Sequence, residues 1–189
     1  MRVIAKKDAL QKAITSAREQ HKKIGLVPTM GALHDGHLSL IRAAVKNNDF
    51  IVVTIFVNPT QFNNPKDLAR YPRDLDADLE LLNGYPVDLI FAPSVKEMYP
   101  EQDRRTFDLS PLDSAMEGRF RPGHFNGVAQ IVSKLFDAVR PDRAYFGQKD
   151  FQQLTIIKKL VSMLNLGIEI ISCPTIREED GLAMSSRNR

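Results

Sequence analysis

The sequence has a single cysteine, Cys173, in 189 residues. One cysteine cannot form an internal disulfide, so a disulfide scaffold is excluded, and a lone thiol fits a reducing cytosol. The longest apolar run, Ile51–Val57, is far shorter than the roughly 18 residues that a membrane helix needs. The first residues also lack the apolar core of a signal peptide. We therefore expect a cytoplasmic protein with no membrane partner.

The sequence has no large excess of charge of one sign, and it lacks two common nucleotide-binding motifs. The 26 basic and 23 acidic residues leave a net charge of +3, and no Lys/Arg run exceeds two residues. A nucleic-acid partner is therefore not expected. There is no G-x-G-x-x-G, and Gly31-x4-Gly36 is followed by His37-Leu38 instead of the Lys-Ser/Thr of a P-loop. A P-loop kinase and a dehydrogenase are both disfavoured.

What is present is an alternation of short apolar runs with helical patterns. The runs are mostly continuous and β-branched, as in strands buried on both faces. They predict strands at Ile24–Thr29, Phe50–Val57, Val87–Phe91, Arg143–Phe146 and Ile168–Ser172, with Met1–Ile4 as a sixth candidate. Apolar stripes predict helices over 125–139, 151–164 and 75–82, the last capped by Asp74. The fold class is therefore α/β, a Rossmann-like parallel sheet of about five or six strands with helices on both faces.

Ligands in such sheets bind beyond the carboxyl ends of the strands, so the following loops carry the functional candidates. The loop Pro28–His37 leads into a helical segment, whose N-terminus favours anions such as phosphate. Its backbone N–H groups, with glycines at positions 31 and 36, are candidate phosphate donors, as are the imidazoles of His34 and His37. The alternative is an incidental histidine pair at a surface turn, and the combined pattern favours phosphate binding.

Three further loops offer polar groups, each with an ordinary structural alternative. Lys149 suits phosphate and Asp150 suits a helix cap, but a routine turn has the same residues. Two hydroxyls and a guanidinium in Met184-Ser185-Ser186-Arg187 suit a polyphosphate, although a polar chain end is usually disordered unless docked. The Glu117–Val128 loop fits an anion site and a mobile surface loop equally well.

Together these segments resemble the pantoate–β-alanine ligase family. The matching segments occur in the family's order and spacing: Pro28–His37, Val57–Phe62, Tyr71–Arg73, Arg121–Val128, Gly147–Gln153 and Asp180–Asn188. A wider resemblance, carried by His-x-Gly-His, is to nucleotidyltransferases and class I aminoacyl-tRNA synthetases. Family members have a further, smaller C-terminal domain. The resemblance thus implies an ATP- and pantoate-binding domain over residues 1–176, and over 177–189 a late ATP-binding loop that begins an absent lid domain.

The resemblance also implies the reaction and its residues. ATP and pantoate give pantoyl adenylate and pyrophosphate, and β-alanine then displaces AMP to form pantothenate. The implied catalytic residues are His37, His34 and Lys149. The implied ATP contacts are Met30, Gly31, Ala32, Leu33, His34, Asp35, Gly36, His37, Gly147, Gln148, Lys149, Asp150, Ile176, Met184, Ser185, Ser186 and Arg187. Pantoate and β-alanine are assigned to Gln61 and Gln153, with Asn58, Arg121 and His124 as weaker candidates.

Magnesium is implied by the ATP chemistry, without an assigned ligand. Asp76 and Asp78 are candidates, but helix-face carboxylates fit the pattern as well. By resemblance the chain is expected to form a homodimer. Two alternative functions stay open: another nucleotidyltransferase of this fold, or a catalytically impaired nucleotide-binding fragment. Gln61 and Gln153 favour a singly charged acid over the phosphate acceptor that the first alternative requires.

Overall fold

The computed structural model describes residues 1–188, so Arg189, the last residue of the predicted 177–189 segment, lies outside the described part. A six-stranded sheet has the order β1-β4-β3-β2-β5-β6, and every pairing is parallel. This confirms the predicted fold class and all six predicted strands. The strands are β1 (Arg2–Ile4), β2 (Ile24–Thr29), β3 (Phe50–Ile55), β4 (Leu89–Phe91), β5 (Arg143–Gly147) and β6 (Glu169–Cys173).

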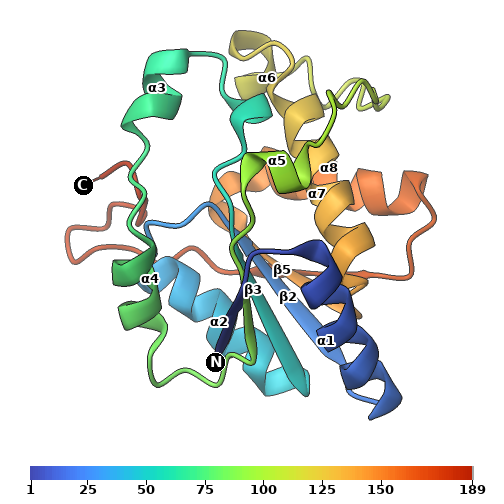
Figure 1. Cartoon of the computed structure of the whole chain (residues 1–189). Helices are drawn as coiled ribbons and strands as arrows, with labels where there is room; N and C mark the ends of the chain where they lie inside the picture. The colour runs from blue at the N-terminus through green and yellow to red at the C-terminus, as the bar shows by residue number, and fades with distance from the viewer. Residues whose placement is uncertain (189) are drawn as a thin grey trace.

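Helices cover both faces of the sheet, with α1, α7 and α8 on one side and α2 and α4 on the other (Figure 1). The α-helices are α1 (Lys7–Glu19), α2 (Asp35–Asn47), α3 (Pro65–Arg70), α4 (Leu75–Leu82), α5 (Val95–Met98), α6 (Met116–Phe120), α7 (His124–Val139) and α8 (Phe151–Met163). Two short 3-10 turns, η1 (Pro59–Gln61) and η2 (Gln148–Asp150), follow β3 and β5.

Two apolar cores explain why the strands are continuous apolar runs. Successive strand residues point to opposite faces. Accordingly Leu26 and Val52 pack with α1, α7 and α8, whereas their neighbours Val27 and Val53 pack with α2 and α4. All four side chains are fully buried. A polar side chain on either face would lose its hydration. The central strands therefore do not show the alternation of apolar and polar residues that is typical of strands with one face in water.

The helix ends agree only partly with the predictions. Asp74 caps α4, because its Oδ1 accepts the backbone N–H of Ala77 at 3.0 Å. Asp150 stands at the N-cap position of α8 but makes no side-chain cap bond, so that prediction is wrong. The predicted α8 stripe also fails at its first residue. Phe151, the first residue of the helix, is 63% exposed, whereas Leu154, one turn later, is buried.

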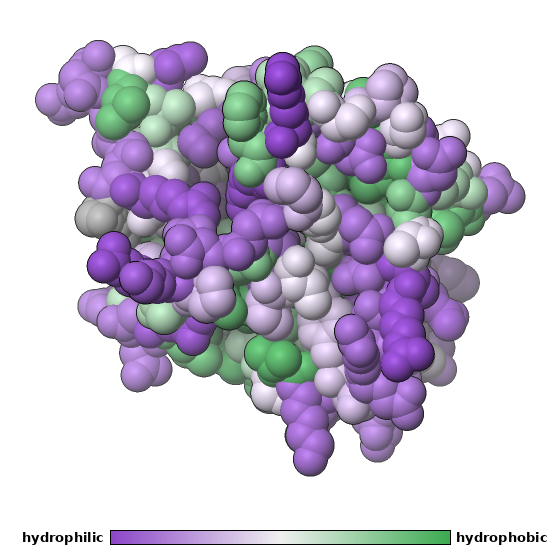
Figure 2. All heavy atoms as spheres, turned by 90° about the horizontal axis from the view of Figure 1, so that it is seen from above, coloured by the Kyte–Doolittle hydropathy of each residue, from purple (hydrophilic) through white to green (hydrophobic). Residues whose placement is uncertain are grey.

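The strand order fixes where loops meet. The chain runs from β2 to β3 on one side, and later places β5 against the other side of β2. The loops after β2 and β5 therefore lead away from each other and leave a crevice at the carboxyl ends of the strands. Seen from above, the surface is mainly hydrophilic, with apolar side chains in small separate patches (Figure 2).

Candidate active site

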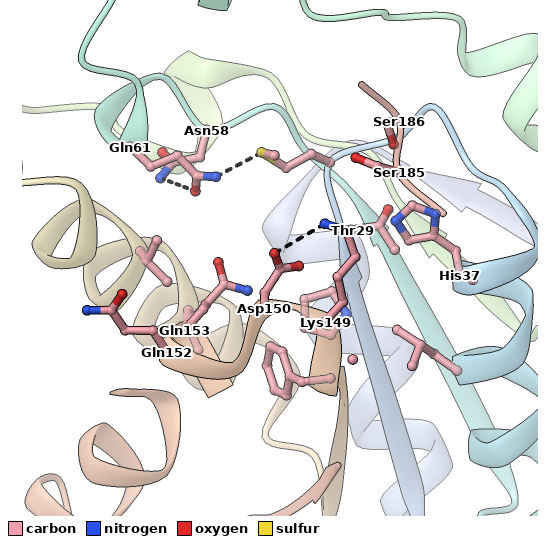
Figure 3. Close-up of a pocket in the computed structure, with 18 of the residues that line it drawn as sticks. Thr29, His37, Asn58, Gln61, Lys149, Asp150, Gln152, Gln153, Ser185 and Ser186 are labelled. Atoms are coloured by element: carbon pink, nitrogen blue, oxygen red, sulfur yellow. Dashed lines mark hydrogen bonds and ion pairs between the residues drawn. The ribbon is translucent and has the colours of Figure 1, made fainter. Parts of the chain in front are cut away.

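A cavity of about 590 Å³ lies at this crevice, within the usual size range of small-molecule sites. Its walls come from the loops after β2, β3, β5 and β6 and from the beginning of α7 (Figure 3). The predicted residues that line it are Met30, His34, Gly36, His37, Asn58, Gln61, Arg121, His124, Gly147, Lys149, Asp150, Gln153, Ile176, Met184, Ser185, Ser186 and Arg187. The chain thus brings together segments separated by more than 150 residues.

Five predicted ATP contacts do not line the cavity: Gly31, Ala32, Leu33, Asp35 and Gln148. Several lining residues had no predicted role, among them Tyr71 and Gln152. Tyr71 falls in a matching segment, but a tyrosine alone carries no signal for a site. Gln152 follows the strand–loop pattern, yet its amide is used to tie α8 to the segment before α6, donating to the carbonyls of Leu112 and Ala115.

The side chains of the two histidines in the first loop accept backbone N–H groups at the N-terminus of α2. His34 Nδ1 accepts the backbone N–H of Gly36 at 3.1 Å, and His37 Nδ1 accepts the backbone N–H of His34 at 3.3 Å. A nitrogen that accepts carries no proton, so each neutral ring has its proton on Nε2. The two ring centroids are 4.1 Å apart. Both imidazoles are therefore oriented as Nε2–H donors at the start of a helix, beside the cavity.

A buried carboxylate holds the same loop from behind. Asp78 is 4% exposed, and its two oxygens accept the backbone N–H groups of Ala32 and Leu33 at 3.0 and 2.7 Å. Gly31 donates its N–H to Thr29 Oγ1 at 3.2 Å. In this structure these three N–H groups donate to the protein itself, and their contact with ATP stays a prediction. The position of Asp78 also fits loop support rather than a metal ligand.

The late loop is docked against the first loop instead of lying free. Ser186 is 8% exposed, and its hydroxyl donates to the carbonyl of Ala32 at 2.9 Å. Arg187 forms an ion pair with Asp67 of α3 at 2.9 Å. Ser186 therefore anchors the late loop in this structure, and its contact with ATP stays a prediction. Ser185 keeps its hydroxyl proton for a ligand, since its oxygen accepts the N–H of Arg187 and it faces the cavity beside His37 (Figure 3).

Lys149 enters the cavity from the loop after β5. Its ammonium lies 3.5 Å from the carboxylate of Asp150, and Figure 3 shows this pair facing the loop of His37. Both side chains are partly exposed, at 38% and 60%, so the pair is weak. A more highly charged anion can therefore replace Asp150 as the partner of Lys149. This is the cation that a triphosphate needs at this wall of the cavity.

Gln61 is held from three sides at the other end of the cavity. Its Oε1 accepts from Asn58 Nδ2 at 3.2 Å, and its Nε2 reaches the sulfur of Met30 at 2.9 Å. Its backbone carbonyl accepts from His124 Nδ1 at 2.7 Å and from the guanidinium of Arg121 at 3.3 Å. The carboxamide therefore presents its NH₂ group, which suits a carboxylate or hydroxyl oxygen. Gln153 faces the same cavity from α8 (Figure 3).

Close packing of α7 against η1 makes Gly127 a sensitive position. A Cβ at Gly127 would lie 2.4 Å from the carbonyl oxygen of Thr60 and 3.0 Å from the backbone nitrogen of Gln61. We expect Gly127→Ala to displace η1, to cost about 1–3 kcal/mol of unfolding free energy in urea, and to weaken binding of a carboxylate at the amide of Gln61. Gly167→Ala is the matched control, because nothing lies within 4 Å of its added carbon. Equal stability of both variants would contradict the prediction.

Protonation of His124 is expected to destabilise the fold. Burial is the main cause that lowers the pKa of His124 below its usual 6.5. The unfolded chain therefore binds the proton first, and the stability present above about pH 6.5 is lost as the pH falls toward the folded-state pKa. We expect the unfolding free energy to fall less between about pH 7 and pH 5 in His124→Asn, whose amide can still donate to Gln61. Parallel pH curves for the two proteins would contradict this.

Among residues 1–188 there is no cluster of three or more His, Cys, Asp or Glu side chains arranged to hold a metal ion. Asp78 already serves two N–H groups, and Asp76 is exposed on α4. The described donor set therefore does not fit a magnesium site made by the protein alone.

Within residues 1–188, no helix has the length and apolar character needed to cross a membrane.

The site lies in a crevice beside β2 of a parallel sheet, and it places paired histidines at a helix start, opposite a lysine and beside a serine. These features define a class of protein. They describe a nucleotide-dependent enzyme with the nucleotidyltransferase-like Rossmann fold. The pantoate–β-alanine ligase family model matches residues 2–189, and the chain belongs to this family.

Individual relatives agree with this assignment. The chain is 61% identical over 189 residues to the pantothenate synthetase of Bacteroides thetaiotaomicron, covering 100% of this chain and 67% of that protein. The pantoate–β-alanine ligase of Francisella tularensis, crystallised with beta-gamma ATP and β-alanine, superposes with a TM-score of 0.96 at 43% identity. That match covers 100% of this chain and 72% of the crystallised one. A tyrosyl-tRNA synthetase from Archaeoglobus fulgidus, at 12% identity and a TM-score of 0.56 over 96% of this chain and 63% of its own, shares the fold alone.

Proposed function

We propose that this chain joins pantoate to β-alanine at the expense of ATP, through pantoyl adenylate, with release of pyrophosphate and AMP. Membership of the family supports this reaction. The observation that carries it at the level of side chains is the division of one cavity into two ends. His34, His37 and Lys149 offer donors for phosphates at one end, and Gln61 offers an amide for an acid at the other.

The first step needs placement and charge neutralisation rather than a base. A carboxylic acid such as pantoate titrates near pH ~4, so its carboxylate is already a nucleophile at neutral pH. It attacks the α-phosphorus in line, and the bond from that phosphorus to the pyrophosphate oxygen breaks. We assign the Nε2–H groups of His37 and His34 and the ammonium of Lys149 to the negative charge that develops on the leaving group. Ser185 adds a hydroxyl donor at the same end.

In the second step the amine of β-alanine attacks the acyl carbon, and the bond to the AMP oxygen breaks. Gln61 is suited to orient the acyl group and then β-alanine, since its NH₂ group faces the cavity. The wall around it, with Asn58, His124 and Gln153, is largely uncharged at neutral pH apart from Arg121. This favours a singly charged acid over a phosphate as the acceptor.

We further propose that residues 1–176 form the ATP- and pantoate-binding unit, and that 177–189 form the late ATP-binding loop. The docking of Ser186 onto the first loop supports this division. ATP is proposed to enter as its magnesium complex, with the ion carried by the phosphates. The homodimer and the cytoplasmic location expected from the sequence stay predictions.

The test is exchange of labelled pyrophosphate into ATP with magnesium and pantoate, which reports the first step without β-alanine. We expect exchange only when pantoate is present. Exchange without an acid, or with a phosphate acceptor in place of pantoate, would assign a different nucleotidyltransferase reaction. No exchange together with no ATP binding by calorimetry would overturn the proposed function for this chain.

A further inference from the structure

Tyr99 does not line the cavity, yet its hydroxyl reaches the side chain that holds Gln61. The tyrosine follows α5, and its O–H donates to Asn58 Oδ1 at 2.8 Å. The hydroxyl of Thr60 donates to the same oxygen at 3.2 Å. Asn58 is 1% exposed, so these contacts replace water around its amide oxygen. The tyrosine thus acts on the cavity wall from behind.

The orientation of the Asn58 amide is fixed by partners on both sides. Its Nδ2 donates to the backbone carbonyl of Gly127 and to Gln61 Oε1, both at 3.2 Å. A backbone carbonyl only accepts, so the NH₂ group of Asn58 must face Gly127 and its oxygen must face Tyr99. Turning the amide over would place an oxygen against the carbonyl of Gly127 and an NH₂ group against the phenol hydroxyl.

This orientation is passed on to Gln61. Since the amide oxygen of Gln61 is occupied by Asn58, its NH₂ group is left facing the cavity and Met30. The sulfur of Met30 is a weak acceptor at 2.9 Å, which an oxygen of an acid substrate can replace with a stronger bond. The direction of the NH₂ group therefore decides whether an acid is recognised.

We propose that Tyr99 is a positioning residue for pantoate, which acts through Asn58 to keep the NH₂ group of Gln61 pointing into the cavity. This rests on the proposed function, because it concerns the acid-binding end of that site. The tyrosine, the asparagine and the glutamine form one chain of hydrogen bonds, of which only the last two members line the cavity.

The surroundings of Tyr99 hold its ring in place. Its ring centroid lies 6.4 Å from that of Phe56, and the ammonium of Lys134 lies 5.0 Å above the ring. Lys134 is in turn paired with the buried carboxylate of Asp103 at 3.2 Å. Burial raises the pKa of Tyr99 above its usual 10, so the hydroxyl stays protonated and able to donate at neutral pH.

The test combines kinetics with a direct view of the amides. Tyr99→Phe, Gln61→Ala and the double variant are compared by pantoate-dependent pyrophosphate exchange. The side-chain NH₂ signals of Asn58 and Gln61, assigned by substitution, are followed by ¹⁵N NMR. Tyr85→Phe is the matched control, because within residues 1–188 the hydroxyl of Tyr85 hydrogen-bonds only to the exposed guanidinium of Arg42.

We expect Tyr99→Phe to move both amide signals and to raise the KM for pantoate about three- to tenfold, as for the loss of one hydrogen bond. The KM for ATP should not change, and the substitution should have no further effect when Gln61 is already alanine. Unmoved amide signals, equal changes in both KM values, or a full additional effect beside Gln61→Ala would each overturn the proposal. If the wild-type chain shows neither exchange nor ATP binding, the proposed function fails, and the NMR signals still decide the role of Tyr99.

Discussion

Asparagine in place of His37 is expected to slow pantoate-dependent pyrophosphate exchange about 10²–10³-fold, whereas glutamine retains much of the rate. The reason is that the two ring nitrogens have different partners. Nδ1 accepts the backbone N–H of His34, and Nε2–H is the donor assigned to phosphate. An asparagine amide lies where Nδ1 was, and a glutamine amide reaches the place of Nε2.

The stabilities of the two His37 variants should follow the opposite order. Asparagine keeps an acceptor for the backbone N–H of His34, while glutamine loses this cap, at a cost of about 0.5–2 kcal/mol in urea unfolding. His21→Asn is the matched control, since His21 is exposed at a left-handed turn where asparagine is tolerated. An asparagine variant that is as active as the glutamine variant would refute the assignment of Nε2.

Asp78→Ala is expected to be the most destabilising single change in the site. It leaves the buried N–H groups of Ala32 and Leu33 without their acceptor, at about 1–3 kcal/mol each. The carboxylate also supports two successive residues with positive φ, Gly31 at 80° and Ala32 at 50°. We expect a loss of roughly 2–6 kcal/mol in urea unfolding, together with a much smaller rise in Tm on adding ATP.

Two comparisons separate loop support from metal binding. Asp76→Ala on the exposed side of the same helix should cost less than about 1 kcal/mol, the usual effect of one acid in a first helical turn. The loss of stability in Asp78→Asn should lie between those of Asp76→Ala and Asp78→Ala, because the asparagine keeps one acceptor oxygen and places an NH₂ group against the other N–H. The losses should be the same with and without magnesium. A loss that appears only with magnesium would make Asp78 a metal ligand instead.

The sheet was predictable because its strands are buried on both faces, which leaves the continuous apolar runs seen in β2 and β3. The first loop was predictable because two glycines and two histidines lie where a strand leads into a helix, a combination that is typical of phosphate-binding loops. The support of that loop was harder to predict. Asp78 falls on the apolar stripe of Leu75, Leu79 and Leu82, three residues after the first and four before the last. A carboxylate on an apolar stripe is a signal of a structural role, although only Leu82 of these three leucines is fully buried.

Other parts carried no signal in the sequence. Nothing in Met184-Ser185-Ser186-Arg187 says which serine turns inward, since that depends on the distance to the carbonyl of Ala32. The same holds for Tyr99, whose partner Asn58 lies 41 residues away in the chain. Contacts of this kind depend on how loops from different strands meet. Local spacing and periodicity describe one segment at a time and do not contain that information.

The bond from Ser186 to the carbonyl of Ala32 has a consequence for how the protein is made. Its two residues are 154 positions apart. At a synthesis rate of about 5–20 residues per second, the ribosome adds Ser186 roughly 8–30 s after Ala32. Throughout that time the nascent chain contains the histidine loop without its late anchor. In a nascent chain arrested before Ser186, the Ala32 segment should thus be open to proteolysis. The same segment should be protected in a chain that includes Ser186 and has been released from the ribosome.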